Sequence, residues 1–257
     1  MTILEAVKRG FVSASKLMNV VAVFFIFNAA IGLITLPLAN PARSGNPGIM
    51  AISIVASVLF FLVFIFLQGG ALGLVKDQLK TTVGSMAQFV VYGKKFYTRI
   101  LGLLLLYVLV AVGIVSILGL ISAGILLLGD SIVTRSLVAA IVTIAALAII
   151  TLLIYPIYVI ATEDKGVLEA FKKGVKTAKA NFWRTLGLFM AMLVASLIIS
   201  LVIGFIVGLI SVPLGPNVSQ ILIAVVNALV QSYIPIVMMG AFMCFYLVIS
   251  DEMEKAG

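Results

Sequence analysis

Hydrophobic residues fill six long stretches of this chain, and short polar segments separate them. A helix needs roughly 20 apolar residues to cross a hydrocarbon core about 30 Å thick. All six stretches are long enough, and none of them contains an acidic or basic residue. The pattern therefore predicts an all-α membrane protein with six transmembrane helices, over Leu17–Ala39, Ile49–Val75, Ile100–Leu128, Leu137–Ala161, Thr185–Val212 and Gln220–Ile249.

The last two stretches belong to a single uncharged run, residues 185–250, which is too long for one span. Two prolines and a glycine interrupt this run at Pro213-Leu-Gly-Pro-Asn217, where they end one helix and reverse the chain. We therefore expect a helical hairpin. Composition agrees with a lipid environment, because 63% of the 257 residues are hydrophobic and 10% are charged, whereas soluble domains are about a quarter charged.

Short segments of the sequence recur. Residues 4–10 read LEAVKRG and residues 168–174 read LEAFKKG, while residues 99–103 read RILGL and residues 184–188 read RTLGL. These matches predict one transmembrane domain, 1–257, made of three parallel repeats at about 1–78, 79–164 and 165–251. Each repeat consists of an interfacial helix followed by a helical hairpin.

An apolar stripe with 3-4-3-4 spacing begins each repeat. Its positions are Leu4, Val7, Phe11, Ala14 and Met18, then Val83, Met86, Val90, Gly93 and Tyr97, then Leu168, Phe171, Val175, Ala178 and Phe182. The intervening positions in the first and third copies are mostly polar or charged, which is typical of an amphipathic helix lying along a membrane surface. We expect such helices over residues 2–18, 82–97 and 166–182.

Basic residues are concentrated on one side of the predicted membrane. Fifteen of the 17 Lys and Arg residues fall in the segments on the amino-terminal side, and Arg43 and Arg135 fall on the other. Because cytoplasmic segments carry the basic excess, both termini are expected in the cytoplasm, with the protein in the cytoplasmic (inner) membrane. The net charge of +8 then faces anionic lipid headgroups, so the basic character does not call for a nucleic-acid partner.

The leading functional hypothesis is a non-enzymatic scaffold or accessory subunit. It would engage anionic lipid or a partner protein, or form a homo-oligomer, through its basic amphipathic helices. The candidate contact residues are Lys8, Arg9, Lys94, Lys95, Lys172, Lys173, Lys176 and Lys179. No catalytic, cofactor-binding or metal-binding residue is predicted, because the chain has no His and only one Cys, Cys244.

Uncharged polar residues within the predicted spans support a second hypothesis. Asn28, Gln68, Asn227 and Gln231 either hydrogen bond between helices or line a polar path. The path would suit a transporter or channel for an uncharged or lipid-like solute, or the permease-like subunit of an ATP-driven system.

Three further features have both a structural and a functional interpretation. Pro156 and Pro235 bend their helices, and the bends either serve packing alone or form a gate. The pairs Gly69/Gly73 and Gly204/Gly208 permit close helix contact. Asp77, Asp164 and Asp251 follow the returning spans at intervals of 87 residues; they either balance nearby lysines or form a ring of carboxylates.

The stretch from Thr162 to Gly174, TEDKGVLEAFKKG, continuing through Asn181 to Gly187 as NFWRTLG, resembles a segment of a broad group of bacterial and archaeal integral membrane proteins. That group includes the membrane domain fused to some glycerophosphodiester phosphodiesterases. The segments Gly69–Asp77 and Phe245–Asp251 are similar to its other recurring segments. The resemblance implies a membrane fold. It does not imply phosphodiester hydrolysis, because the fused catalytic domain uses His residues that this chain lacks.

Overall fold

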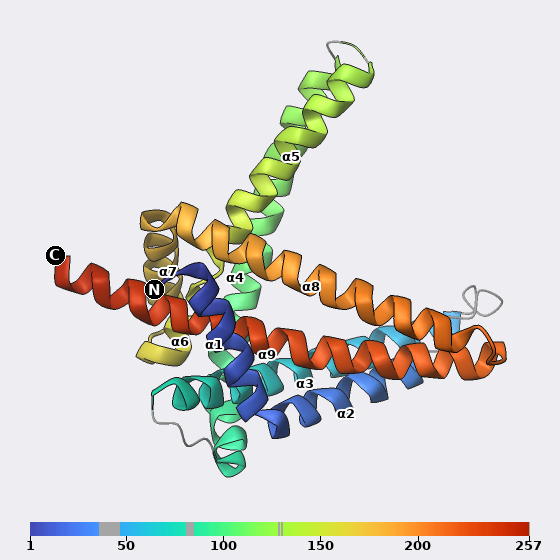
Figure 1. The fold of residues 1–257 in the computed structure, drawn as a ribbon. Helices are drawn as coiled ribbons and strands as arrows, with labels where there is room; N and C mark the ends of the chain where they lie inside the picture. Colours follow the sequence, from blue (N-terminus) through green and yellow to red (C-terminus); the bar gives the residue numbers. More distant parts are fainter. Residues whose placement is uncertain (36–46, 81–84, 128, 130, 257) are drawn as a thin grey trace. The chain divides into compact units, whose positions relative to one another are not determined.

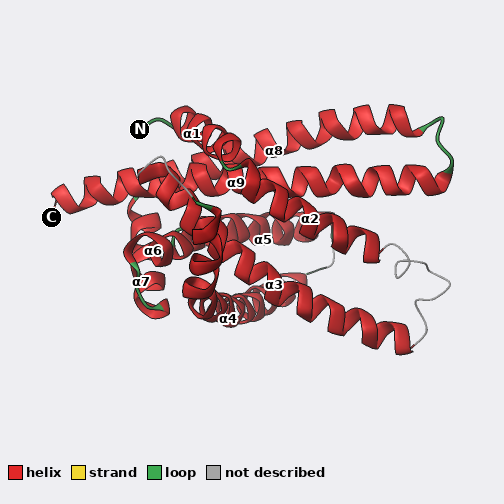
Figure 2. Cartoon of the chain, turned by 90° about the horizontal axis from the view of Figure 1, so that it is seen from below, coloured by secondary structure: helices red, strands yellow, loops and turns green. Residues whose placement is uncertain are grey.

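The computed structural model describes residues 1–35, 47–80, 85–127, 129 and 131–256, and within these the regular structure is entirely helical (Figure 2). The helices are α1 (Ile3–Lys16), α2 (Met18–Thr35), α3 (Pro47–Lys80), α4 (Met86–Leu127), α5 (Ile132–Leu153), α6 (Pro156–Glu163), α7 (Val167–Ala180), α8 (Phe182–Ser211) and α9 (Pro216–Ala256). Six segments are long and apolar enough to cross a membrane, counting α5 and α6 as one. The predicted all-α membrane fold with six spans is confirmed.

The chain divides into two compact units. One comprises Met1–Tyr97 with Met190–Gly257, and the other comprises Thr98–Phe189, so that α4 and α8 each continue from one unit into the other. The single domain over 1–257 stays a prediction.

Helix α9 is the centre of the first unit. α1, α2 and α3 all pack against it, and Figure 1 shows α1 crossing α9. The apolar side chains of Phe24 on α2, Ile65 on α3 and Phe245 on α9 are almost fully buried here. Because lipid is as apolar as these side chains, their burial stabilises the unit through close van der Waals packing rather than through removal from water.

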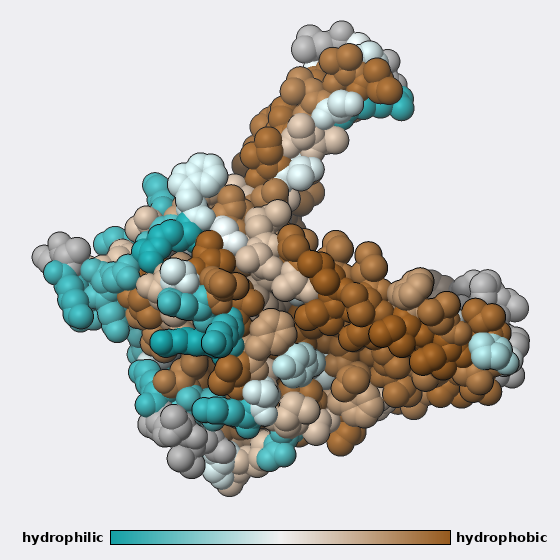
Figure 3. All heavy atoms as spheres, viewed as in Figure 1, coloured by the Kyte–Doolittle hydropathy of each residue, from teal (hydrophilic) through white to brown (hydrophobic). Residues whose placement is uncertain are grey.

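Helices α8 and α9 form the predicted hairpin. The turn between them is held by a hydrogen bond from the Leu214 amide to the Ser211 carbonyl, 3.1 Å, and by the Ser219 hydroxyl, which donates to the same carbonyl at 2.9 Å. Hydrophobic side chains cover the hairpin surface seen in Figure 3. On α8, Leu201 and Phe205 are among the exposed apolar residues. In a membrane this surface faces lipid.

The second unit contains a break that divides the predicted span Leu137–Ala161. α5 ends at Leu153 and α6 begins at Pro156, whose ring cannot continue the helical hydrogen bonds. The Tyr155 hydroxyl next to the break lies 2.9 Å from the Thr185 hydroxyl, and both residues are fully buried. Pro235, in contrast, lies inside the continuous helix α9.

Other boundaries also differ from the sequence prediction. The separate helices expected over 82–97 and 100–128 form one helix, α4, because no breaker separates Tyr97 from Ile100. The predicted positions 36–39, Arg43, Val83 and Leu128 lie outside the described residues.

Candidate functional site

Helix α1 packs one narrow face of small residues against α9. Its N-terminus is closed by a capping box, in which the Thr2 hydroxyl accepts a hydrogen bond from the Glu5 amide and the Glu5 carboxylate accepts one from the Thr2 amide, 2.9 Å. The second of these bonds lowers the pKa of Glu5. Gly10 is the point of closest approach, because a methyl group there would overlap the Val237 carbonyl and the Ala241 side chain.

Helix α7 repeats this arrangement on α6. The buried positions of α1 are Ala6, Gly10, Ser13 and Ala14, and those of α7 are Ala170, Gly174, Thr177 and Ala178, each 164 residues later. Gly174 lies against the Pro156 ring, which leaves no room for a side chain. The residues that end the two helices, Leu17 and Asn181, are also 164 residues apart and have similar backbone angles, φ −106° and ψ 35° against φ −120° and ψ 34°.

The first turns of α4 pack on the end of α3, with glycines on both helices. Gly69 of α3 lies against Gly93 of α4, and Gly73 lies against the Tyr92 ring. The Tyr92 hydroxyl also donates a hydrogen bond to the Asp77 carboxylate, 2.6 Å. Close contact at the pair Gly69/Gly73 is therefore confirmed.

The apolar stripe predicted for the amphipathic helices is only partly covered on α1 and α7: its first residue is exposed, the next two are half-buried and its alanine is buried. Leu4 is 78% exposed and Leu168 is 63% exposed, whereas Ala14 and Ala178 are buried. The sequence prediction placed this stripe along the membrane surface and assigned no face of these helices to a protein contact. The structure packs the neighbouring face of small residues against the protein, because small residues allow two helix backbones to approach closely. Side chains such as Leu168 stay available to a membrane surface.

Most of the eight predicted contact cations are exposed. Only Lys173 is half-buried, and it forms an ion pair with Glu163, 2.7 Å. Arg9 donates a hydrogen bond to the Cys244 sulfur at 3.6 Å, and the Lys95 ammonium lies 5.6 Å from the centre of the Phe96 ring. Of these eight, the cations for which no described residue forms an ion pair or hydrogen bond are Lys8, Lys94, Lys172, Lys176 and Lys179.

The three aspartates at 87-residue intervals have different surroundings. Asp77 accepts the hydrogen bond from Tyr92, and Asp164 pairs with Arg99. Asp164 also ends α6 in the left-handed conformation, with φ 58°. Asp251 is exposed near the end of α9. Because two of the three already have partners, these residues fit the structural interpretation better than a ring that binds cations.

The four predicted intramembrane amides do not form one path. The Asn28 amide donates to the Ser232 hydroxyl at 3.0 Å and so joins α2 to α9. Gln68 is half-buried, while Asn227 and Gln231 are exposed. The sequence analysis did not identify Ser232 as this partner. The Ser232 hydroxyl donates to the Ala228 carbonyl one turn earlier in the same helix, and nothing in the local sequence indicates that it also accepts from Asn28.

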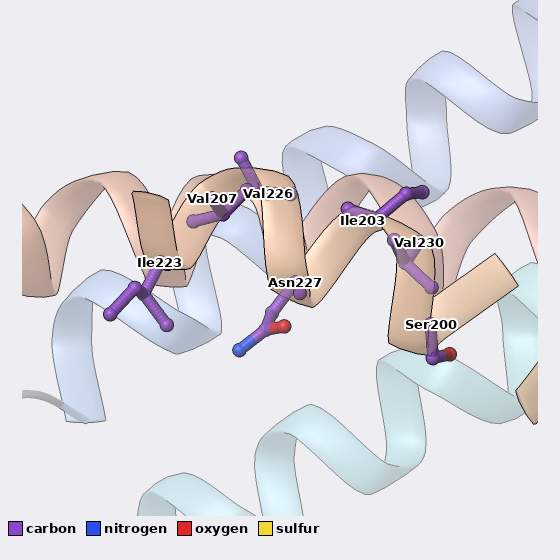
Figure 4. Close-up of a pocket in the computed structure, with 9 residues that line it drawn as sticks. Ser200, Ile203, Val207, Ile223, Val226, Asn227 and Val230 are labelled. Atoms are coloured by element: carbon purple, nitrogen blue, oxygen red, sulfur yellow. The ribbon is translucent and has the colours of Figure 1, made fainter. Parts of the chain in front are cut away.

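Two cavities border two of these amides, Asn28 and Asn227, and both cavities lie in the first unit. One, of about 330 Å³, is bordered by Asn28, Thr35 and Ser57 and by aromatic side chains that include Phe27 and Phe64. The other, of about 200 Å³, lies between α8 and α9, and the residues that line it are Ser200, Ile203, Gly204, Val207, Gly208, Ile223, Val226, Asn227 and Val230 (Figure 4). The two cavities share no lining residue.

The pair Gly204/Gly208 does not bring helices together. A methyl group at either position would meet no atom within 4 Å, so the close contact expected from the sequence is wrong for this pair. The two glycines instead form part of the wall of the cavity between α8 and α9. No cluster of metal-binding side chains occurs among the residues that the structure describes.

A family model described as "Domain of unknown function (DUF7847)" matches residues 1–249, and the chain belongs to this family. No curated protein and no solved structure matches the chain. The resemblance to the membrane domain fused to glycerophosphodiester phosphodiesterases stays a prediction.

Proposed function

We propose that this member of the DUF7847 family is a non-enzymatic membrane scaffold or accessory subunit that binds anionic lipid through its basic amphipathic helices. The observation that carries the proposal is the shared geometry of α1 and α7. Each helix packs its face of small residues on a spanning segment, and each leaves the first leucine of its apolar stripe, Leu4 or Leu168, and basic side chains exposed.

The basic face of α7 has the spacing that a flat membrane surface requires. Lys172, Lys176 and Lys179 follow one another at i, i+4 and i+7 and lie on the side of the helix opposite the buried residues Ala170 and Thr177. Lysines near an anionic membrane surface each contribute about 1 kcal/mol to binding. Insertion of the neighbouring Leu168 into the interface would add an apolar contribution.

The proposal includes three parallel repeats in the cytoplasmic membrane, with both termini in the cytoplasm. The shared buried positions of α1 and α7 support the repeat, and the unequal distribution of Lys and Arg supports the orientation. In this orientation the basic helices face the leaflet whose anionic lipids attract them.

The test replaces Lys172, Lys176 and Lys179 together by Gln and measures how much phosphatidylglycerol, relative to phosphatidylcholine, stays bound to the purified protein in native mass spectrometry. We expect a loss of preference of up to about 100-fold, because three charges each contribute about 1 kcal/mol. The matched control replaces the same residues by Arg, which keeps the charge.

The Arg variant should keep the lipid preference, and added salt should weaken the preference of the wild type. An unchanged preference for phosphatidylglycerol in the Gln variant would contradict lipid binding by α7. If the Gln variant instead lost a co-purifying protein while its lipid preference stayed unchanged, α7 would be a docking surface for that protein.

A second candidate function is the passage or binding of an uncharged or lipid-like solute. The cavity bordered by Asn28, Thr35 and Ser57 favours it, because hydroxyl and amide groups there meet aromatic walls. One observation argues against a continuous route for the solute: Asn28 and Asn227 border different cavities, which share no lining residue. Leakage of an uncharged solute from proteoliposomes, compared between wild type and Ser57→Leu, tests it; equal leakage would exclude passage through this cavity.

A further inference from the structure

Three amide side chains form a stripe along one face of α9. Gln220, Asn227 and Gln231 are separated by seven and four residues, which places them within about 40° of one another around the helix axis. All three are exposed, and no described residue forms a hydrogen bond with their side chains.

Two of these amides lie deep in the span. At a rise of about 1.5 Å per residue, Asn227 lies about 17 Å and Gln231 about 23 Å from the start of α9 at Pro216. A polar group at that depth finds no water, and leaving it without a hydrogen bond is costly. Pro235 also has no N–H to donate to the Gln231 carbonyl, four residues earlier, which adds an acceptor to the same face. The stripe therefore requires a partner that both donates and accepts.

We propose that the partner is α9 of a second copy of this chain, so that the protein forms a symmetric dimer through the stripe of Gln220, Asn227 and Gln231. Copies inserted with the same orientation are related by a two-fold axis along the membrane normal, and equivalent residues then meet at equal depth. A primary amide carries both donors and acceptors, so Asn227 complements Asn227 and Gln231 complements Gln231.

The rest of the chain offers few amides to satisfy the stripe. Residues 98–189 contain no Gln and only one Asn, Asn181, which lies between α7 and α8 rather than in a span. The Ser116 and Thr151 hydroxyls in that part of the chain already donate to carbonyls of their own helices. Asn28 is bound to Ser232. A lipid acyl chain has no hydrogen-bonding group, so it cannot replace a second α9.

The cavity between α8 and α9 gives the partner room beside the stripe. Asn227 borders it, and in Figure 4 its amide points to the same side of the helix pair as the Ser200 hydroxyl. Gly204 and Gly208 leave the α8 wall open. A side chain from the second copy can therefore enter this cavity while the amides pair, which is the combination of small residues and polar contacts that holds membrane helices together.

The test uses a variant without the native thiol, Cys244→Ala, into which Ile223→Cys is introduced, because position 223 is exposed, lies one turn before Asn227, and its change leaves all three amides in place. Oxidation in membranes should give a cross-linked dimer. The matched control is Leu229→Cys, an exposed position at similar depth on the opposite face of α9, which should give none. With one cysteine per chain, any disulfide must join two copies.

Replacing Asn227 and Gln231 by Leu should abolish the cross-link at position 223 and convert the purified protein from dimer to monomer in light scattering. Folding of this variant is verified by an unchanged helical circular dichroism spectrum. The proposal is overturned if the wild type is monomeric, if positions 223 and 229 cross-link equally, or if the Leu variant remains a dimer.

Discussion

The Tyr107 hydroxyl donates a hydrogen bond to the Leu153 carbonyl, 2.7 Å away, and so connects α4 to the end of α5. The carbonyls of a last helical turn have no donor within their own helix. The tighter i→i+3 bond that often satisfies such a carbonyl is also missing here, because the residue three positions after Leu153 is Pro156, which has no N–H. A side chain from another span therefore completes the break.

Replacing Tyr107 by Phe should destabilise the protein by about 1–3 kcal/mol, because the Leu153 carbonyl is then left without a donor in an apolar environment. The midpoint of thermal unfolding in detergent measures the effect. Tyr97→Phe is the control, since no described residue hydrogen bonds to the Tyr97 hydroxyl. Equal stability of the two variants would show that the bond contributes nothing.

The two crossing glycines should not tolerate a methyl group. Gly10→Ala and Gly174→Ala are each expected to cost about 1–3 kcal/mol, because the added carbon overlaps the backbone of α9 or the Pro156 ring. Gly119→Ala on α4 meets no atom within 4 Å and should be neutral or slightly stabilising. Unfolding titrations of the three variants provide the comparison, and a similar result for all three would rule out tight packing at Gly10 and Gly174.

Neighbouring lysines on α7 should differ in their effect on lipid binding. Lys172 is exposed, and no described residue pairs with it, whereas Lys173 is held by Glu163 at 2.7 Å. Lys172→Gln should reduce retention of phosphatidylglycerol, while Lys173→Gln should leave it near the wild-type level and reduce stability by about 0.2–1 kcal/mol. A larger loss of phosphatidylglycerol in Lys173→Gln than in Lys172→Gln would show that Lys173 is not paired with Glu163 in the membrane.

The start of α1 should loosen in acid. The Thr2 amide donates to Glu5 and lowers the pKa of that carboxyl group. A lowered pKa in the folded state means that the contribution is present above the pKa of the unfolded chain and is lost as the pH falls through the folded value. Amide hydrogen exchange in the first turn should therefore speed up in acid, beyond the intrinsic pH dependence of exchange. Glu5→Gln should remove that extra change.

The orientation is tested by labelling a cysteine at position 45, between the first two spans, in the Cys244→Ala background. We expect an impermeant thiol reagent to reach it from the side opposite the cytoplasm, because Arg43 and Arg135 are the two basic residues predicted there. A cysteine near the chain end, at Gly257, should react only from the cytoplasmic side. Labelling of position 45 from the cytoplasmic side alone would reverse the proposed topology.

The sequence by itself determined the six spans and the final hairpin. In lipid, the backbone groups of a long uncharged run form their hydrogen bonds within a helix. The prolines at 213 and 216 end one such helix and begin the next. The segments LEAVKRG and LEAFKKG also placed α1 and α7 correctly. Such features follow from local composition, so no knowledge of distant contacts is needed to predict them.

Only the tertiary structure decided which face of α1 and α7 packs on the protein and that Asn28 pairs with Ser232. An apolar stripe such as Leu4 and Leu168 suits a lipid surface as well as a protein interior, so hydrophobic periodicity does not distinguish the two. The buried face follows instead from how closely Gly10 approaches Val237 and Gly174 approaches Pro156. The first contact joins segments far apart in the chain, and the second depends on the helix break before Pro156. Both follow from how the helices pack, which the spacing of residues in the sequence does not reveal.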